Sequence, residues 1–198
     1  MSQAQRSGAR SRGKARAKKR SPGVVVAVTL AVVAATVAAV VTSTGRSHGG
    51  DLTVAYDRGT QVLDFRGESF AGKPLDTAAL RGKPVVLNFY ASWCTVCDRE
   101  LPDFQRVSER LAGRVQFVGA NPQSNDTTAA SQKMLKRSGV TYPTLPDPQD
   151  ELLRQFNTTG GLPTTVFIDG NGVVRKVHNG LLTEQLLLDE IAALGVQA

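Results

Sequence analysis

The sequence predicts an α/β sandwich. The first observation is an apolar run of strand length at residues 85–90, followed by a helical pattern at 98–112. The second is a continued alternation of strand-like and helix-like segments over residues 115–156. The third is a hairpin pattern at 164–178 with a helical stretch after it. Strands that alternate with helices in this way are typical of α/β proteins.

The segment before the first apolar strand carries weaker signals. We expect the folded domain to start near Leu52. Residues 60–70 roughly alternate between apolar and polar side chains, which predicts a strand or a hairpin. Asp76 is expected to cap a short helical turn. The sequence Gly-Lys-Pro at 82–84 then turns the chain into the apolar strand.

The middle of the chain continues the alternation. Residues 115–119 form the next predicted strand. Asp126 is expected to cap a helix that runs to about Ser138 and ends at a glycine. A short extended piece at 142–145 and a short helix at 151–156 follow.

The C-terminal part predicts a hairpin and a helix. Residues 164–168 are rich in β-branched side chains, and 169–172 read Asp-Gly-Asn-Gly, which is strong turn chemistry. Residues 173–178 are therefore expected to return antiparallel. Thr183 is the expected cap of a last helix. Its apolar positions recur at helical spacing: Leu186, Leu187, Ile191 and Leu194.

The junction between the apolar strand and its helix holds the only two cysteines, Cys94 and Cys97. Two intervening residues allow one turn of helix to bring the sulfurs within bonding distance. Cys94 would lie in the first turn, where unpaired N–H groups and the helix dipole favour a thiolate. This arrangement predicts that Cys94 attacks a thiol–disulfide partner and that Cys97 resolves the mixed disulfide.

Other uses of the cysteine pair fit less well. A zinc site needs about four ligands, and only His48 and His178 could add to the pair. Covalent haem attachment needs CxxCH, whereas residue 98 is Asp. A purely structural disulfide stays open, although a loop this short constrains the unfolded chain little. We expect no metal and no cofactor.

The charge is concentrated at the N-terminus. Of 24 Lys and Arg, eight lie in residues 1–22, where there is no acid, so 16 basic residues face 17 acidic ones in the remainder. The net charge of +7 therefore belongs to a tail, which we expect to be disordered. Because an apolar span follows, nucleic-acid binding by the tail is not the favoured interpretation.

Residues 23–42 are predicted to be a transmembrane signal-anchor helix. The 18 residues at 24–41 carry no charge and cover about 27 Å as a helix. The basic flank predicts a cytoplasmic N-terminus and an extracytoplasmic domain at 52–198, joined by a flexible linker at 43–51. The alternative is a cleaved signal peptide and a secreted protein, but this apolar region exceeds the usual range of about 7–15 residues. A lipoprotein does not fit, because no cysteine closely follows the span.

Residues 60–195 resemble the TlpA/ResA-like family of membrane-anchored thioredoxin-fold proteins. Three segments carry the resemblance in their order and separations as well as in their residues: Gly82-Lys83-Pro84-Val85-Val86-Leu87-Asn88-Phe89-Tyr90-Ala91-Ser92-Trp93-Cys94, then Cys97-Asp98-Arg99-Glu100-Leu101-Pro102, then Gly161-Leu162-Pro163-Thr164-Thr165-Val166-Phe167-Ile168-Asp169. The resemblance implies a thioredoxin-like three-layer α/β/α sandwich with a mixed central sheet, preceded by one transmembrane helix.

The resemblance also implies roles for residues around the cysteines. Pro163 would follow a cis peptide bond and face the cysteine pair, while Leu162 would present its backbone to a peptide as a strand edge does. Thr164 would support them. A trans proline in a loop is the alternative. Trp93 would shield the disulfide and contact partners, with plain packing as its alternative.

Several positions depart from the family pattern. Val96 stands where relatives often have proline, so the redox potential does not carry over. Asn88 stands where thioredoxin has a buried acid, and an amide cannot accept the proton. Residues 120–124 hold no acid. The proton shuttle is therefore unassigned. Glu100 is nearest in sequence, but the favoured interpretation is a supporting acid in the first helical turn.

The resulting prediction is a membrane-tethered, extracytoplasmic thiol–disulfide oxidoreductase that reduces exported proteins. The resemblance suggests cytochrome c maturation as a setting and a membrane-embedded dithiol relay as electron donor. The alternatives are an oxidant or isomerase of secreted proteins, and a non-catalytic thioredoxin-like binding module. A peroxidase of the peroxiredoxin type would need Thr at position 91, which is Ala.

Overall fold

A computed structural model describes residues 52–57, 60–156 and 161–197. The predicted basic tail, transmembrane segment and linker lie outside these residues. Among the helices that the structure describes, none is both long and apolar enough to cross a membrane.

A five-stranded mixed sheet forms the centre of the domain, as the family resemblance implied. The strand order is β6-β5-β4-β7-β8. β4 pairs in parallel with β5 and antiparallel with β7, so it is the central strand. The bounds are β4 Val85–Phe89, β5 Gln116–Pro122, β6 Thr144–Asp147, β7 Thr164–Ile168 and β8 Val174–Asn179.

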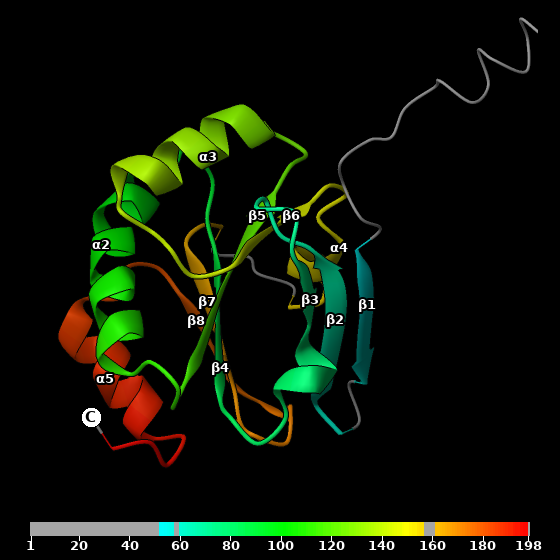
Figure 1. The fold of residues 1–198 in the computed structure, drawn as a ribbon, viewed down its shortest axis with the longest axis vertical. Coiled ribbons are helices and arrows are strands. Elements are labelled where there is room, and N and C mark those ends of the chain that lie inside the picture. The colour runs from blue at the N-terminus through cyan, green and yellow to red at the C-terminus, as the bar shows by residue number, and fades with distance from the viewer. Residues whose placement is uncertain (1–51, 58–59, 157–160, 198) are drawn as a thin grey trace, which may run out of the picture. The chain divides into compact units, whose positions relative to one another are not determined.

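Two helices cover one face of this sheet (Figure 1). They are α2 (Thr95–Arg110) and α5 (Glu184–Ala192), and they pack side by side. Their apolar side chains meet those of β4, β5 and β7 in one buried cluster that includes Phe104, Phe117 and Ile191. The T-shaped contact between Phe104 and Phe117, at 6.3 Å between ring centroids, fixes α2 against the sheet.

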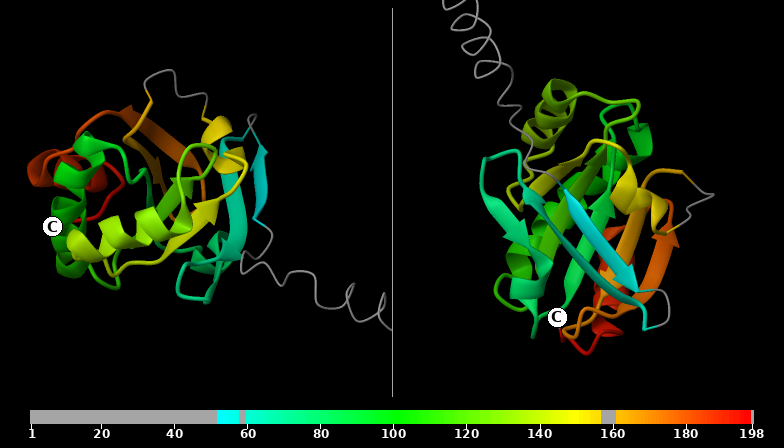
Figure 2. Two further views of the ribbon diagram at one scale, coloured as in Figure 1. Left: turned by 90° about the horizontal axis from the view of Figure 1, so that it is seen from above. Right: turned by 90° about the vertical axis from the view of Figure 1, so that its right-hand side faces the viewer.

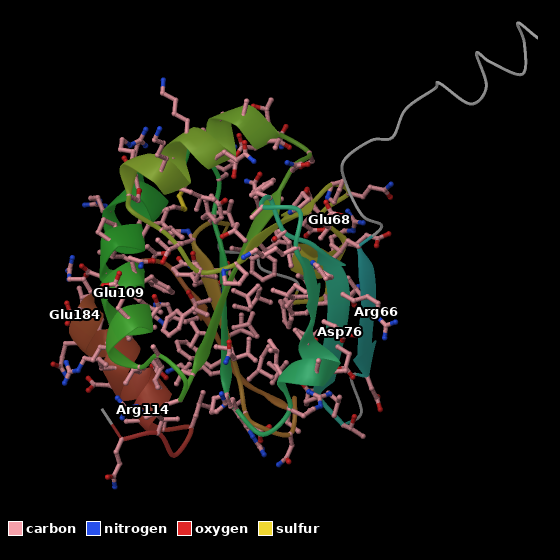
Figure 3. All side chains as sticks on the ribbon, viewed as in Figure 1. Arg66, Glu68, Asp76, Glu109, Arg114 and Glu184 are labelled. Carbon is pink, nitrogen blue, oxygen red and sulfur yellow. A yellow bond between two sulfur atoms is a disulfide. The ribbon has the colours of Figure 1, made fainter. Side chains whose placement is uncertain are left out.

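The opposite face of the main sheet differs from the helical layer that a three-layer α/β/α sandwich implies. A second, antiparallel sheet covers much of it, with strands β1 (Thr53–Asp57), β2 (Val62–Glu68) and β3 (Pro74–Asp76) (Figure 2). The alternation in β2 explains this layer: Leu63 and Phe65 are buried against the main sheet, and Arg66 points outward. On the outer side, Arg66 and Asp76 lie beside each other at 3.6 Å (Figure 3).

Short helices complete the fold. The 3₁₀ helix η1 (Thr77–Leu80) follows Asp76, whose side chain accepts from Ala78 N as predicted. The helix α4 (Glu151–Arg154) lies on the same side as the small sheet through Leu152, and α3 (Thr128–Arg137) packs above the end of β4 through Met134.

One predicted helix cap is wrong. Thr127, not Asp126, caps α3, because the Thr127 hydroxyl accepts from Ala130 N. Both residue types have this capping chemistry, and the carboxylate of Asp126 is engaged elsewhere. Thr183 caps α5 as predicted.

Candidate active site

Cys94 and Cys97 form a disulfide where β4 leads into α2. Cys94 is the N-cap of α2, and its Sγ accepts a hydrogen bond from Cys97 N at 3.1 Å. The turn before it is closed by Cys94 N, which donates to Ala91 O at 3.0 Å. Cys94 is 5% exposed and Cys97 is fully buried. Cys94 is therefore the less deeply buried cysteine of the pair.

This geometry can stabilise an anion on Cys94 once the disulfide is reduced. The backbone N–H of Cys97 points at Sγ, and the positive end of a 16-residue helix lies behind it. Both effects lower the pKa of a thiol. Cys97 lies one turn further along the helix, which is the position required for a resolving thiol.

The segment that holds Pro163 packs beside the cysteines. The Leu162–Pro163 peptide is cis, as the resemblance implied. Leu162 is half-buried and packs against the apolar cluster that contains both cysteines. The Thr164 hydroxyl lies 2.7 Å from Gly161 O and 2.9 Å from Asn179 Oδ1, so it ties this segment to β8.

Trp93 precedes Cys94 and is 59% exposed. A large indole left this open is not explained by packing within the domain. Its position fits the predicted contact with a partner protein.

Glu100 is not the first-turn helix acid that we expected. It is the sixth residue of α2, and Asp98 is the acid in the first turn. Glu100 is fully buried, and its Oε1 accepts from Asn88 Nδ2 at 2.9 Å. Its Oε2 accepts from Leu182 N at 3.1 Å, which ties α2 to the segment before α5. Cys97 and Glu100 are three residues apart, so they share one face of the helix.

Burial raises the pKa of Glu100 to about 7, even though hydrogen bonds from Asn88 and Leu182 lower it. A carboxyl group with this pKa can gain or lose a proton near neutral pH. The Asn88 amide suits either form, because it can donate to a carboxylate or, if rotated, accept from a carboxylic acid. Within the described residues, Asn88 Oδ1 is buried without a hydrogen-bond partner.

Two contributors to this buried polar group were not predicted from the sequence. Thr165 pairs with Asn88 across β4 and β7, and its hydroxyl accepts from Asn88 Nδ2 at 3.3 Å. Leu182 contributes only a backbone N–H, which no side-chain pattern reveals. The sequence did hold a signal for Thr165, because antiparallel pairing of the strands at 85–90 and 164–168 would bring side chains on the two strands next to each other.

Within the part of the chain that the structure describes, no three His, Cys, Asp or Glu side chains are grouped so that they could hold a metal ion. The chemistry of this site is that of two sulfurs and one buried carboxyl group.

Comparison with known proteins finds relatives that are named as thiol–disulfide enzymes. Residues 58–177 match the AhpC/TSA family. The thiol-disulfide oxidoreductase ResA of Halalkalibacterium halodurans is 30% identical over 130 residues, which cover 65% of this chain and 72% of ResA. The thiol:disulfide interchange protein DsbE of Yersinia pestis is 34% identical over 139 residues, which cover 69% of this chain and 71% of DsbE.

A solved structure shows the same fold. A DsbF homologue from Corynebacterium diphtheriae is 30% identical and superposes with a TM-score of 0.60, covering 76% of this chain and 96% of that one. The range that matches the AhpC/TSA family, 58–177, contains β4 to β7, both cysteines and the cis peptide bond.

Proposed function

This chain belongs to the AhpC/TSA family and is a thiol–disulfide oxidoreductase of the ResA/DsbE type, and on that basis we propose that it reduces disulfides of exported proteins. The observation that carries the proposal is the disulfide-bonded cysteine pair at the N-terminus of α2, in which Cys94 is slightly exposed and Cys97 is fully buried. The exposed Trp93, next to Cys94 in the sequence, gives a partner protein a surface to contact.

The reaction runs in two displacements. The Cys94 thiolate attacks one sulfur of a substrate disulfide, so a mixed disulfide forms and the other substrate sulfur leaves as a thiolate. Cys97 then loses its proton and attacks Cys94 Sγ. The mixed disulfide breaks, the Cys94–Cys97 bond forms, and the substrate leaves with its second thiolate. Two electrons pass from the enzyme dithiol to the substrate.

In this scheme Glu100 accepts the Cys97 proton. Both side chains are fully buried on one face of α2, one turn apart. The raised pKa of Glu100, about 7, lets the carboxylate take a proton at neutral pH and release it later. Asn88 and Leu182 hold the carboxylate in place.

A second candidate function is disulfide formation or isomerisation in secreted proteins. The hydrogen bond from Cys97 N to Cys94 Sγ favours it, because stabilising a thiolate stabilises the reduced enzyme and raises the potential. The equilibrium potential against glutathione distinguishes the two. A reductase lies near the thioredoxin end, about −270 mV, and an oxidant near about −120 mV.

We further propose that the domain works outside the cytoplasm while tethered to the cell membrane by residues 23–42. The charge pattern of that segment supports the tether. A membrane-embedded dithiol relay would then supply the electrons. The intact mass of the protein from the membrane fraction tests the tether, since removal of a signal peptide would lower the mass by about 4 kDa.

Trapping of the mixed disulfide tests the proposed substrate class. Cys97→Ser leaves the attacking sulfur but removes the resolving one, so exported proteins should accumulate as disulfide-linked adducts. Cys94→Ser is the matched control and should trap none. A Cys97→Ser protein that collects no exported partner in cells would refute the proposal.

A further inference from the structure

The segment that leads from β4 to the redox cysteines is held by a carboxylate from outside that segment. Asp126 Oδ2 accepts from Ser92 N at 2.6 Å, and Asp126 Oδ1 accepts from Ser92 Oγ at 2.6 Å. Ser92 and Asp126 are 34 residues apart in sequence. Both hydrogen-bond donors of Ser92, which lies two residues before Cys94, are therefore fixed by one side chain.

The carboxylate is itself held from two further sides. Asn121 Nδ2 donates to Asp126 Oδ2 at 2.9 Å, and Thr127 N donates to Asp126 Oδ1 at 2.7 Å. Asn121 Nδ2 also reaches Tyr90 O at 3.1 Å. Residues 90–92, which we call the approach segment, are thus attached to β5 and to the start of α3.

Asp126 is not needed to start α3, because Thr127 provides that cap. Its four hydrogen bonds go to one residue of the approach segment and to two residues that orient the carboxylate. Partial burial acts to raise the pKa of Asp126, but the hydrogen bonds from Ser92, Asn121 and Thr127 together lower it. The carboxylate therefore stays charged, and charge-assisted hydrogen bonds are the stronger kind.

We propose that Asp126 is a positioning residue for the redox centre: by fixing Ser92 it sets the placement of Trp93 and Cys94 for attack on a protein disulfide. Trp93 is 59% exposed and directly follows Ser92 in the chain, so a shift of the Ser92 backbone would move the indole. The inference rests on the thiol–disulfide activity proposed above. Its main test below does not depend on that activity.

The experiment uses the single tryptophan of the chain as a reporter. Asp126→Ala should increase acrylamide quenching of Trp93 fluorescence about twofold, because the approach segment gains freedom. It should lower kcat/KM for a protein disulfide about tenfold, as expected when a reacting group is displaced. The rate at which iodoacetamide alkylates Cys94, measured on the plateau that this rate reaches at high pH, should change less than twofold. Iodoacetamide is a small reagent and needs no docking surface.

Thr127→Ala is the matched control. It removes the cap of the neighbouring helix and lowers stability, while the contacts of Ser92 with Asp126 remain. Quenching of Trp93 should stay at the wild-type value. Ser92→Ala removes only the hydroxyl contact, so its effects should lie between those of wild type and Asp126→Ala. It serves as the test if Asp126→Ala does not fold.

Equal quenching in Asp126→Ala, Thr127→Ala and wild type would overturn the positioning role. A loss of kcat/KM that follows the fall in Tm to the same extent in Asp126→Ala and Thr127→Ala would also overturn it. If no variant has activity but quenching rises only when the Ser92 contacts are lost, the positioning inference stands and the proposed function fails.

Discussion

Glu100 and Asn88 form a hydrogen bond of 2.9 Å between two fully or almost fully buried side chains, one on α2 and one on β4. The bond places an ionisable group inside the domain, one helical turn from the buried cysteine. A charged carboxyl group in such a site destabilises the folded state. When its pKa is near neutral, the same group can take part in proton transfer.

The first prediction concerns stability and pH in the oxidised protein. The pKa of Glu100 is raised from 4.5 to about 7, so the folded state binds a proton more readily than the unfolded state. The stability that Glu100 contributes is fully present below pH 4.5 and is lost as pH rises to about 7. Glu100→Gln removes this loss and should gain up to about 3 kcal/mol over wild type at pH 8, with little gain at pH 4.5.

Urea denaturation at both pH values measures the difference. Glu109→Gln, at an exposed position of the same helix, is the control for substituting a glutamate on α2. A Glu100→Gln protein that is equally stable relative to wild type at both pH values would show that the buried carboxyl group does not titrate as described.

The second prediction separates the two chemical steps. If Glu100 takes the proton of Cys97, Glu100→Gln should slow the resolution of a preformed mixed disulfide on Cys94 by about 10²-fold. The formation of that mixed disulfide should change much less, because it does not require Cys97. Stopped-flow measurement with a chromogenic disulfide follows both steps. If both steps slow equally, or if neither step slows, Glu100 is not the proton acceptor.

The central elements of the fold could be predicted because their signals are local. The Asp-Gly-Asn-Gly turn specifies the β7–β8 hairpin, and the apolar run at 85–90 specifies a strand buried on both faces. The small sheet over one face was not predicted. Whether Leu63 and Phe65 cover the main sheet depends on packing between distant segments, and the alternation in β2 alone does not show it.

The candidate site divides in the same way. The spacing of Cys94 and Cys97 was sufficient to predict their disulfide, because the geometry of one helical turn is fixed. The environment of Glu100 was not predictable, since its burial follows from where α2 begins and what lies across the sheet. Asp126 was misassigned because an acid near a helix start can cap that helix or bind a different loop.

The third prediction tests the small sheet as part of the core. Leu63 is fully buried against the main sheet, so Leu63→Ala should lower the free energy of unfolding by about 3 kcal/mol. Arg66→Ala, on the outer side of the same strand, should change it by about 0.5 kcal/mol or less. Chemical denaturation measures both. A loss below about 1 kcal/mol for Leu63→Ala would mean that the small sheet packs only loosely on the domain.

The ionisation of Cys94 in the Cys97→Ser protein is the most direct test of its role as the attacking thiolate. That variant keeps the backbone N–H that points at Cys94 Sγ, so the thiolate remains stabilised. The rate of alkylation by iodoacetamide against pH should have its midpoint at least one unit below the ordinary thiol value of about 8.5, and urea-unfolded protein should return to that value. A folded-state midpoint at or above about 8.5 would contradict the assignment of Cys94 as the attacking thiolate.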